Sequence, residues 1–186
     1  LLGEAYADLV LEAIAQSDPV PAEELTPRFA FAKFMAPLDN IELFVGLSME
    51  IADGYVDYLY ETEEFPCDFF GCLDVPCAVL KLGGAVTIVT FPGAFTPELV
   101  VGGIVTPDFY EGPFADVEAE PALVDHLATE HRFVIGLAGA EIGYVYPKMT
   151  FDPPNHFSQI HGPGPKVASY FMNGLAELLD QLNAEN

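Results

Sequence analysis

Basic residues are scarce in this chain of 186 residues. It contains 6 Lys and Arg residues against 29 Asp and Glu residues, which gives a formal net charge of −23. A field of this sign repels phosphate backbones instead of attracting them. We therefore expect that no nucleic acid is a partner of this protein.

Long apolar runs are also missing. No run approaches the roughly 18 consecutive apolar residues that a membrane-spanning helix needs, so we expect no membrane span. Hydrophobic residues still make up 51% of the chain, enough to build the core of one domain or of part of one. We treat residues 1–186 as a single segment. Its start without Met, inside a helical pattern, predicts missing upstream sequence, with a trimmed mature N-terminus as the alternative.

Cysteine occurs only three times, as Cys67, Cys72 and Cys77 at five-residue spacing. Three thiolates without a nearby fourth ligand make a poor structural zinc site. Two other interpretations are open: a local disulfide with one spare thiol, or three reduced and partly buried cysteines. A disulfide would imply an oxidising compartment.

Apolar residues recur at helical spacing in several stretches. They predict helices over residues 2–16, 40–51 and 165–183, and another that starts at Pro121 within the acidic segment 116–131. The first helix has an apolar stripe that needs a partner. Thr96-Pro97-Glu98 places a hydroxyl at an N-cap, Pro at the first helical position and an acid in the first turn, so a further helix should begin there.

β-rich runs predict four strands. They cover residues 28–35, 77–82, 85–91 and 132–137. Gly83-Gly84 separates the middle two and predicts a hairpin. A strand, a helical crossover and a strand predict parallel pairing between the last two, within a mixed sheet. The predicted fold class is α/β, a mixed β-sheet flanked by helices.

Two turns leave strand ends where ligands gather in open α/β sheets. They are residues 90–99 and 136–147. Both are apolar with few polar groups. The residues alone therefore support a binding-loop hypothesis, with ordinary turns as the alternative.

The turn sequences resemble the neutral/alkaline ceramidase family. In that family a strand closes in a Leu-Pro-Gly-Glu turn and a later strand leads to Gly-Leu-Ala-Asn-x-x-x-Gly-Tyr-Val. The matching stretches here are Val86 to Gly93 and Gly136 to Val145, and Pro37-Leu38-Asp39-Asn40 and His156-Phe157 with Gly164-Pro165 fit the same order. The resemblance spans nearly the whole chain. It implies the C-terminal part of the catalytic domain, a partial domain of a larger zinc-hydrolase fold.

The family hydrolyses the amide bond of N-acylsphingosine, with a zinc held by two His, a Glu and a Tyr. The resemblance implies that both His ligands lie upstream, in a missing N-terminal part of the same domain. Tyr144 matches the metal-side tyrosine, but Ala94 stands where the family has Glu. We therefore expect no zinc bound by this segment alone, and we assign it no catalytic residue. The resemblance, together with the cysteine cluster, also favours a secreted or extracellular protein.

The remaining candidates concern a lipid or other amide substrate. Phe91 and Phe95 are candidates for an acyl-chain groove, with core packing as the alternative. Glu141 and His156 are candidate substrate-binding residues, with solvated or backbone-bonded loop positions as the alternative. His156 and His161 lie five apart and could share a cation. Two functions follow from this set: a segment of an amide hydrolase, or a ligand-binding scaffold that has lost its zinc.

Overall fold

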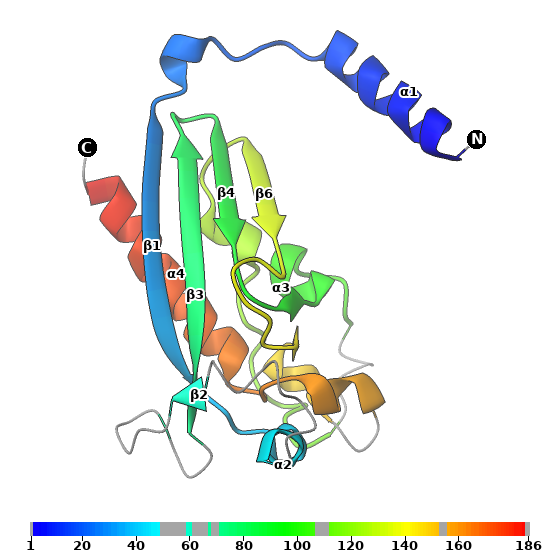
Figure 1. Ribbon diagram of the computed structural model, residues 1–186, viewed down its shortest axis with the longest axis vertical. Helices are drawn as coiled ribbons and strands as arrows, with labels where there is room; N and C mark the ends of the chain where they lie inside the picture. Colours follow the sequence, from blue (N-terminus) through cyan, green and yellow to red (C-terminus); the bar gives the residue numbers. More distant parts are fainter. Residues whose placement is uncertain are drawn as a thin grey trace.

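A mixed sheet with one long helix on one face forms the body of the protein (Figure 1). The computed structural model describes residues 2–48, 59–60, 67, 71–106, 112–152 and 156–184. Its elements, in chain order, are α1 (Leu2–Gln16), η1 (Ala22–Glu24), β1 (Pro27–Pro37), α2 (Ile41–Ser48), β2 (Leu59–Tyr60), β3 (Cys72–Leu82), β4 (Val86–Thr90), β5 (Ala94–Phe95), α3 (Pro97–Val101), η4 (Leu123–His126), β6 (His131–Ile135), β7 (Tyr144–Val145), η5 (Lys148–Thr150), η6 (Phe157–His161) and α4 (Val167–Ala184).

The main sheet has the strand order β1-β3-β4-β6, and β2 pairs with the start of β3. The predicted hairpin is confirmed: β3 and β4 are antiparallel, and Gly83 turns the chain with φ of +56°. The predicted parallel pairing is also confirmed, in a register from Val86 opposite His131 to Thr90 opposite Ile135. The α/β class with a mixed sheet is therefore observed.

Strand β3 is longer than the sequence predicts, because it continues through Pro76 to Cys72. Proline lacks the N–H of a ladder bond and is tolerated where one side of a strand is open. Pro76 meets that condition, since β4 ends opposite Ala78 while β1 continues beside β3 to Cys72. The proline therefore marks where one ladder stops and not where the strand begins.

The predicted helix within residues 116–131 is wrong. Only the single 3₁₀ turn η4 forms there. The chain is anchored before this turn by Glu120, whose carboxylate accepts hydrogen bonds from the Lys148 N–H and the Ser169 hydroxyl. It is anchored after the turn by the Thr129 hydroxyl, which donates to Thr87 Oγ1 at 2.8 Å. One turn between these anchors buries Leu123, so tertiary contacts override the helical pattern.

The core lies between the sheet and α4. Helix α4, predicted over residues 165–183, buries one continuous face against the strands. Its most enclosed large side chains are Phe171, Leu175 and Leu182, which belong to one cluster with Val75, Val79 and Val89 of the sheet. This packing fixes the strand ends from which the candidate loops depart.

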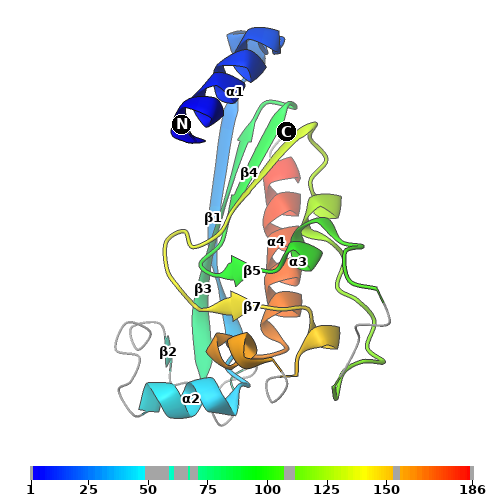
Figure 2. The same cartoon turned by 90° about the vertical axis from the view of Figure 1, so that its right-hand side faces the viewer.

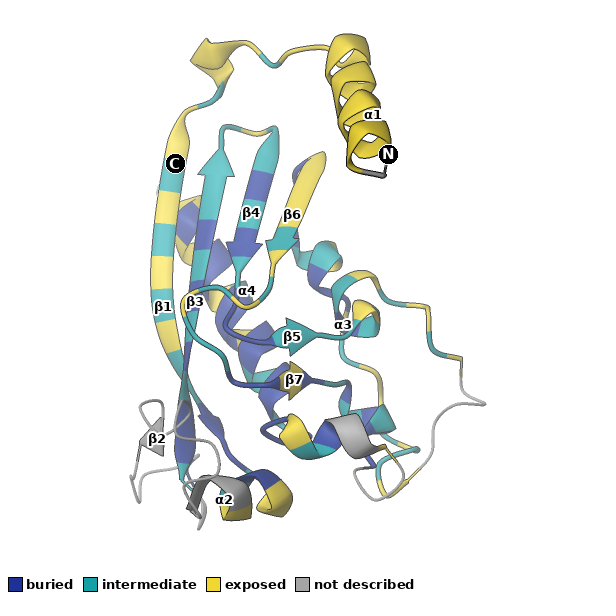
Figure 3. Cartoon of the chain, turned by 45° about the vertical axis from the view of Figure 1, so that its right-hand side comes forward, coloured by how far each residue is buried: buried dark blue, intermediate teal, exposed yellow. Residues whose placement is uncertain are grey.

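Helix α1 forms as predicted, but its stripe remains unburied. Every one of its side chains from Gly3 to Gln16 is exposed, and Figure 3 shows the helix standing clear of the sheet. Helix α2 begins at Ile41, one residue after the predicted start, because the Asn40 side chain accepts the N–H of Glu42 at 3.1 Å and acts as its cap. Residues 49–51 of that prediction lie outside the described residues.

The cysteines form a local disulfide between Cys67 and Cys72, with Cα atoms 5.0 Å apart, and Cys77 is free and buried. This confirms the first of the two interpretations left open by the sequence. Burial raises the pKa of the Cys77 thiol to about 12, which keeps it protonated and unreactive at neutral pH. Within the described residues, none of the helices is both long and apolar enough to cross a bilayer.

Candidate functional site

The two loops singled out in the sequence meet in a second, two-stranded sheet. Strands β5 and β7 pair in parallel, with Ala94 opposite Tyr144 and Phe95 opposite Val145 (Figure 2). The Ala94 N–H donates to Gly143 O at 3.0 Å, and the Thr96 N–H donates to Val145 O at 3.1 Å. The site therefore follows from parallel pairing of β4 and β6, because both strands deliver their loops to the same edge.

Gly143 allows a third segment to join these loops. Its φ is +88°, and a Cβ at this position would lie 1.9 Å from the backbone oxygen of His161. Only glycine accepts both the left-handed backbone and this close approach without strain. The loop that carries His161 is thereby held against β7.

A cavity of about 290 Å³ opens at this junction. It is lined by Ala94, Leu137, Glu141, Gly143, Tyr144 and His161. Tyr144 is 47% exposed, so its ring forms a wall of the cavity and is not a core residue. Glu141 Oε1 accepts the N–H of Gly143 at 2.7 Å, which is the backbone-bonded role considered from the sequence.

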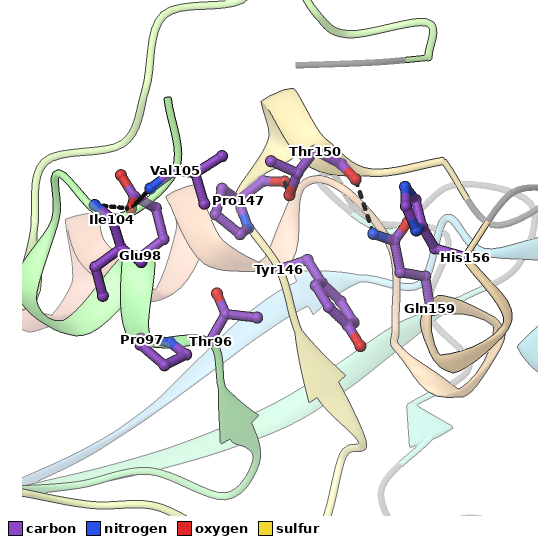
Figure 4. A pocket seen from close by; sticks show the side chains of 10 residues that line it. All are labelled: Thr96, Pro97, Glu98, Ile104, Val105, Tyr146, Pro147, Thr150, His156 and Gln159. Carbon is purple, nitrogen blue, oxygen red and sulfur yellow. Dashed lines mark hydrogen bonds between the residues drawn. The ribbon is translucent and has the colours of Figure 1, made fainter. Parts of the chain in front are cut away.

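A second, larger cavity of about 410 Å³ is lined by residues from several segments that meet around Tyr146, just after β7 (Figure 4). Its lining is mainly apolar and consists of Thr96, Pro97, Glu98, Ile104, Val105, Tyr146, Pro147, Thr150, His156 and Gln159. The ring centroids of Tyr144 and Tyr146 are 6.2 Å apart. These two tyrosines, one in each lining, connect the cavities.

The wall of the larger cavity is shaped by Glu98. It lies in the first turn of α3, as predicted, but its carboxylate reaches past the end of that helix. It accepts backbone N–H groups of Gly103, Ile104 and Val105 at 3.1, 2.7 and 2.7 Å. Thr96 precedes the helix as predicted, yet its hydroxyl makes no cap bond and is enclosed without a partner. Glu98 is thus a structural clamp on the loop that supplies Ile104 and Val105.

The other predicted site residues separate into two groups. Phe91 is only 2% exposed and stacks on Phe95 at 3.8 Å, and both rings pack against Phe171 of α4. They match the core alternative, and neither lines the two cavities described above. His156 lines the larger cavity and His161 the smaller one, so the structure places the two imidazoles in different cavities.

Two polar residues before α2 support the loop of His161. The Asn40 amide donates to the backbone oxygens of Gln159 and Gly162, at 3.1 and 2.6 Å. Asp39 lies 3.5 Å from the Lys166 ammonium, but its Oδ1 is buried without a hydrogen-bond partner. Burial raises the pKa of the Asp39 carboxyl, and the nearby Lys166 offsets this only in part.

The ligand set that the resemblance implies is incomplete at the smaller cavity. Ala94 offers no donor atom, and Tyr144 is the one residue of the resemblance's ligand set at this position. In the described part of the chain no three His, Cys, Asp or Glu side chains come together as a metal site. No chemical step is therefore assigned to a metal here.

Sequence reasoning missed Tyr146 and the larger cavity. Tyr146 belongs to the predicted turn 136–147, but it follows the two-residue strand β7, so strand alternation does not assign it to a face. The role of Glu98 gave no signal either, since its partners follow a helix end that the sequence does not locate. A comparison with models of known protein families found no match, and neither did a comparison with curated proteins.

The close approach at Gly143 can be tested with a matched pair of substitutions. Gly139 has nearly the same φ, +86°, but open space around it. We expect Gly139→Ala to cost about 1–2 kcal/mol, the price of a left-handed alanine. Gly143→Ala should cost at least about 1 kcal/mol more, because it also meets the His161 carbonyl. Urea unfolding of both variants measures this, and equal losses would contradict the role given to Gly143.

The raised pKa of Asp39 predicts pH-dependent stability. The native state binds the Asp39 proton more tightly than the unfolded state does. The charged carboxylate therefore destabilises the fold at pH values above its native pKa, and this effect is absent below the ordinary pKa of 3.8. Asp39→Asn should raise the free energy of unfolding at pH 7, and the gain should disappear as the pH falls towards 3.8. Asp180→Asn, at an exposed position of α4, is the control and should have little effect at either pH. Thermal unfolding at several pH values measures this gain. A gain in stability that grows on acidification would contradict the raised pKa of Asp39.

Proposed function

We propose that this chain forms the lipid-amide binding part of a ceramidase-like amide hydrolase. The observation that carries the proposal is the meeting of Ala94 and Tyr144 in one cavity, next to a larger apolar cavity that begins at Tyr146. Ala94 and Tyr144 are the two positions that the family resemblance pairs at its metal. The apolar cavity accepts an acyl chain, and the smaller cavity accepts the amide.

The two cavities suit the two ends of such a ligand. A volume of about 410 Å³ is within the range of small-molecule sites, which runs from about 300 to 1,000 Å³. Its mainly apolar lining favours a hydrocarbon chain by the hydrophobic effect. The smaller cavity has three polar side chains in its lining, Tyr144, Glu141 and His161, which can orient an amide by hydrogen bonds.

Charge supports a neutral ligand. The chain carries a formal net charge of −23, so its field disfavours a free fatty-acid carboxylate near the cavity. An N-acyl amide has the same hydrocarbon tail without that charge. We therefore assign amides, and N-acylsphingosines among them, as the ligand class in preference to free fatty acids.

The hydrolytic step belongs to the upstream part of the domain in this proposal. The purified 186-residue chain should bind an N-acylsphingosine but neither hydrolyse it nor hold stoichiometric zinc. The second candidate function is a ligand-binding scaffold without hydrolysis in any context, and Ala94 is the observation that favours it. Hydrolysis on addition of the upstream part separates the two.

The acyl-chain site can be tested by filling it. Val105 lines the larger cavity, whereas Val101, four residues earlier, is 53% exposed on α3 and is not part of the lining. We expect Val105→Trp to weaken binding of a short-chain N-acylsphingosine at least about tenfold, about 1.4 kcal/mol, and Val101→Trp to leave it unchanged. Isothermal titration measures both. No saturable binding by the wild type, or equal effects of the two substitutions, would sink the binding proposal.

The metal-side assignment has a separate test. Ala94→Glu places a carboxylate opposite Tyr144, in the cavity that already holds Glu141 and His161. We expect this variant to bind Zn²⁺ at least about tenfold more tightly than the wild type, in competition with a chromophoric chelator. Ala128→Glu adds the same charge at an exposed position outside the cavity and should give no gain. If Ala94→Glu gains nothing over this control, the ceramidase resemblance of the site is wrong even where amide binding holds.

A further inference from the structure

Among the residues that the structure describes, no helix covers one face of the main sheet. Figure 1 shows α4 behind the sheet and nothing helical in front of it. We call this front side the outer face; the strand register aligns its side chains in two rows, Phe29-Leu80-Ile88-Phe133 and Phe31-Ala78-Thr90-Ile135. The four at its edges, Phe29, Phe31, Phe133 and Ile135, are 65, 55, 54 and 48% exposed. Aromatic and branched side chains in adjacent rows form a contiguous apolar patch, which marks an interaction surface.

Helix α1 carries a second unburied apolar surface. Tyr6, Leu9, Val10 and Ile14 are 70, 64, 42 and 63% exposed and follow helical spacing, so they form one stripe. The acidic side chains Glu4, Asp8 and Glu12 lie four residues apart on the opposite side, which also carries Leu11, 63% exposed. A helix of this pattern is stable when its apolar stripe packs on another apolar surface.

The connector between α1 and β1 holds the helix away from its own sheet. Residues 17–21 include Asp18-Pro19 and Val20-Pro21, and both prolines and the residues before them are restricted to extended conformations. Pro21 has φ −56° and ψ 134°, a polyproline conformation. The following residues are tied to the hairpin, where the Gly83 N–H donates to Thr26 O at 2.9 Å. A short, stiff connector does not reverse the chain, and Figure 2 shows α1 beyond the end of the strands.

We propose that, in the 186-residue chain on its own, α1 packs on the outer face of a second copy and the two copies exchange their α1 helices; this proposal does not depend on the upstream part that the hydrolase proposal invokes. Both contacts are then identical by two-fold symmetry, as in other exchanged dimers. Eight large exposed side chains, four on the stripe and four on the sheet, form each contact. At about 100 Å² for each side chain, two contacts bury about 1,600 Å², the size of a stable interface.

Charge sets the condition under which the dimer forms. Each copy carries a formal net charge of −23, so the two copies repel each other at long range. The contact itself is apolar, and salt shortens the range of the repulsion, to a Debye length of about 3 Å at 1 M. Dimerisation should therefore become stronger as the NaCl concentration rises.

The test is sedimentation of the full chain at low and high NaCl. We expect the wild type to be dimeric at high salt and Leu9→Asp, on the stripe, to be monomeric. Ala15→Asp adds the same charge on the acidic side of α1 and should remain dimeric. All these positions are exposed, and circular dichroism checks that each variant keeps its fold.

Mixing two variants identifies the exchange. Phe133→Asp damages the sheet side of the contact and should also give a monomer. A mixture of Leu9→Asp and Phe133→Asp contains one intact helix and one intact outer face, which restores one of the two contacts. It should therefore form heterodimers that are weaker than the wild-type dimer but stronger than any dimer of either variant alone. The proposal is overturned by a wild type that stays monomeric at high salt, by equal effects of Leu9→Asp and Ala15→Asp, or by a mixture without heterodimers. A monomer whose α1 is protected from proteolysis would show that the helix closes on its own sheet instead.

Discussion

The parallel pairing of β4 and β6 is the constraint on which the candidate site depends. Two parallel strands end at the same edge of a sheet, so the loops that follow them start side by side. Here these loops pair again as β5 and β7, and that second pairing sets Ala94 against Tyr144. The packing of α4 against the sheet, on the side opposite the outer face, holds the two strands in this register. The position of Ala94 opposite Tyr144 is a consequence of that arrangement.

The sequence predicted the elements whose signals are local. Gly83-Gly84 between two β-rich runs indicated the hairpin, and the periodic apolar residues of α4 indicated a long buried helix. The helix prediction around Leu123 failed because the helical pattern competes with hydrogen bonds to distant residues. Glu120 accepts one from Ser169, and Thr129 donates one to Thr87. Such contacts join positions far apart in the chain, and periodicity within a window cannot report them.

The site was predicted in part for the same reason. Glu141 was found because a turn after a strand is a recognisable context, and Tyr144 was found through the family resemblance. The larger cavity was not, since Ile104 and Val105 reach it only through the Glu98 carboxylate that binds their N–H groups. The lining comes from three separate stretches, residues 96–105, 146–150 and 156–159, and only the folded chain brings them together. Ala94 is different, because its identity alone shows that this position lacks the side-chain metal ligand of the family, whatever the geometry.

The extension of β3 also has a consequence for oxidative folding. Cys72 and Cys77 both lie on this strand, five residues apart, so an extended chain separates their Cα atoms by about 16 Å. A disulfide needs them within about 7 Å. Once β3 is formed, this wrong pairing is closed off, and the remaining thiol is sealed inside the core. Formation of β3 thus prevents one incorrect disulfide. Isomers that join Cys72 to Cys77 arise only in chains in which β3 has not yet formed.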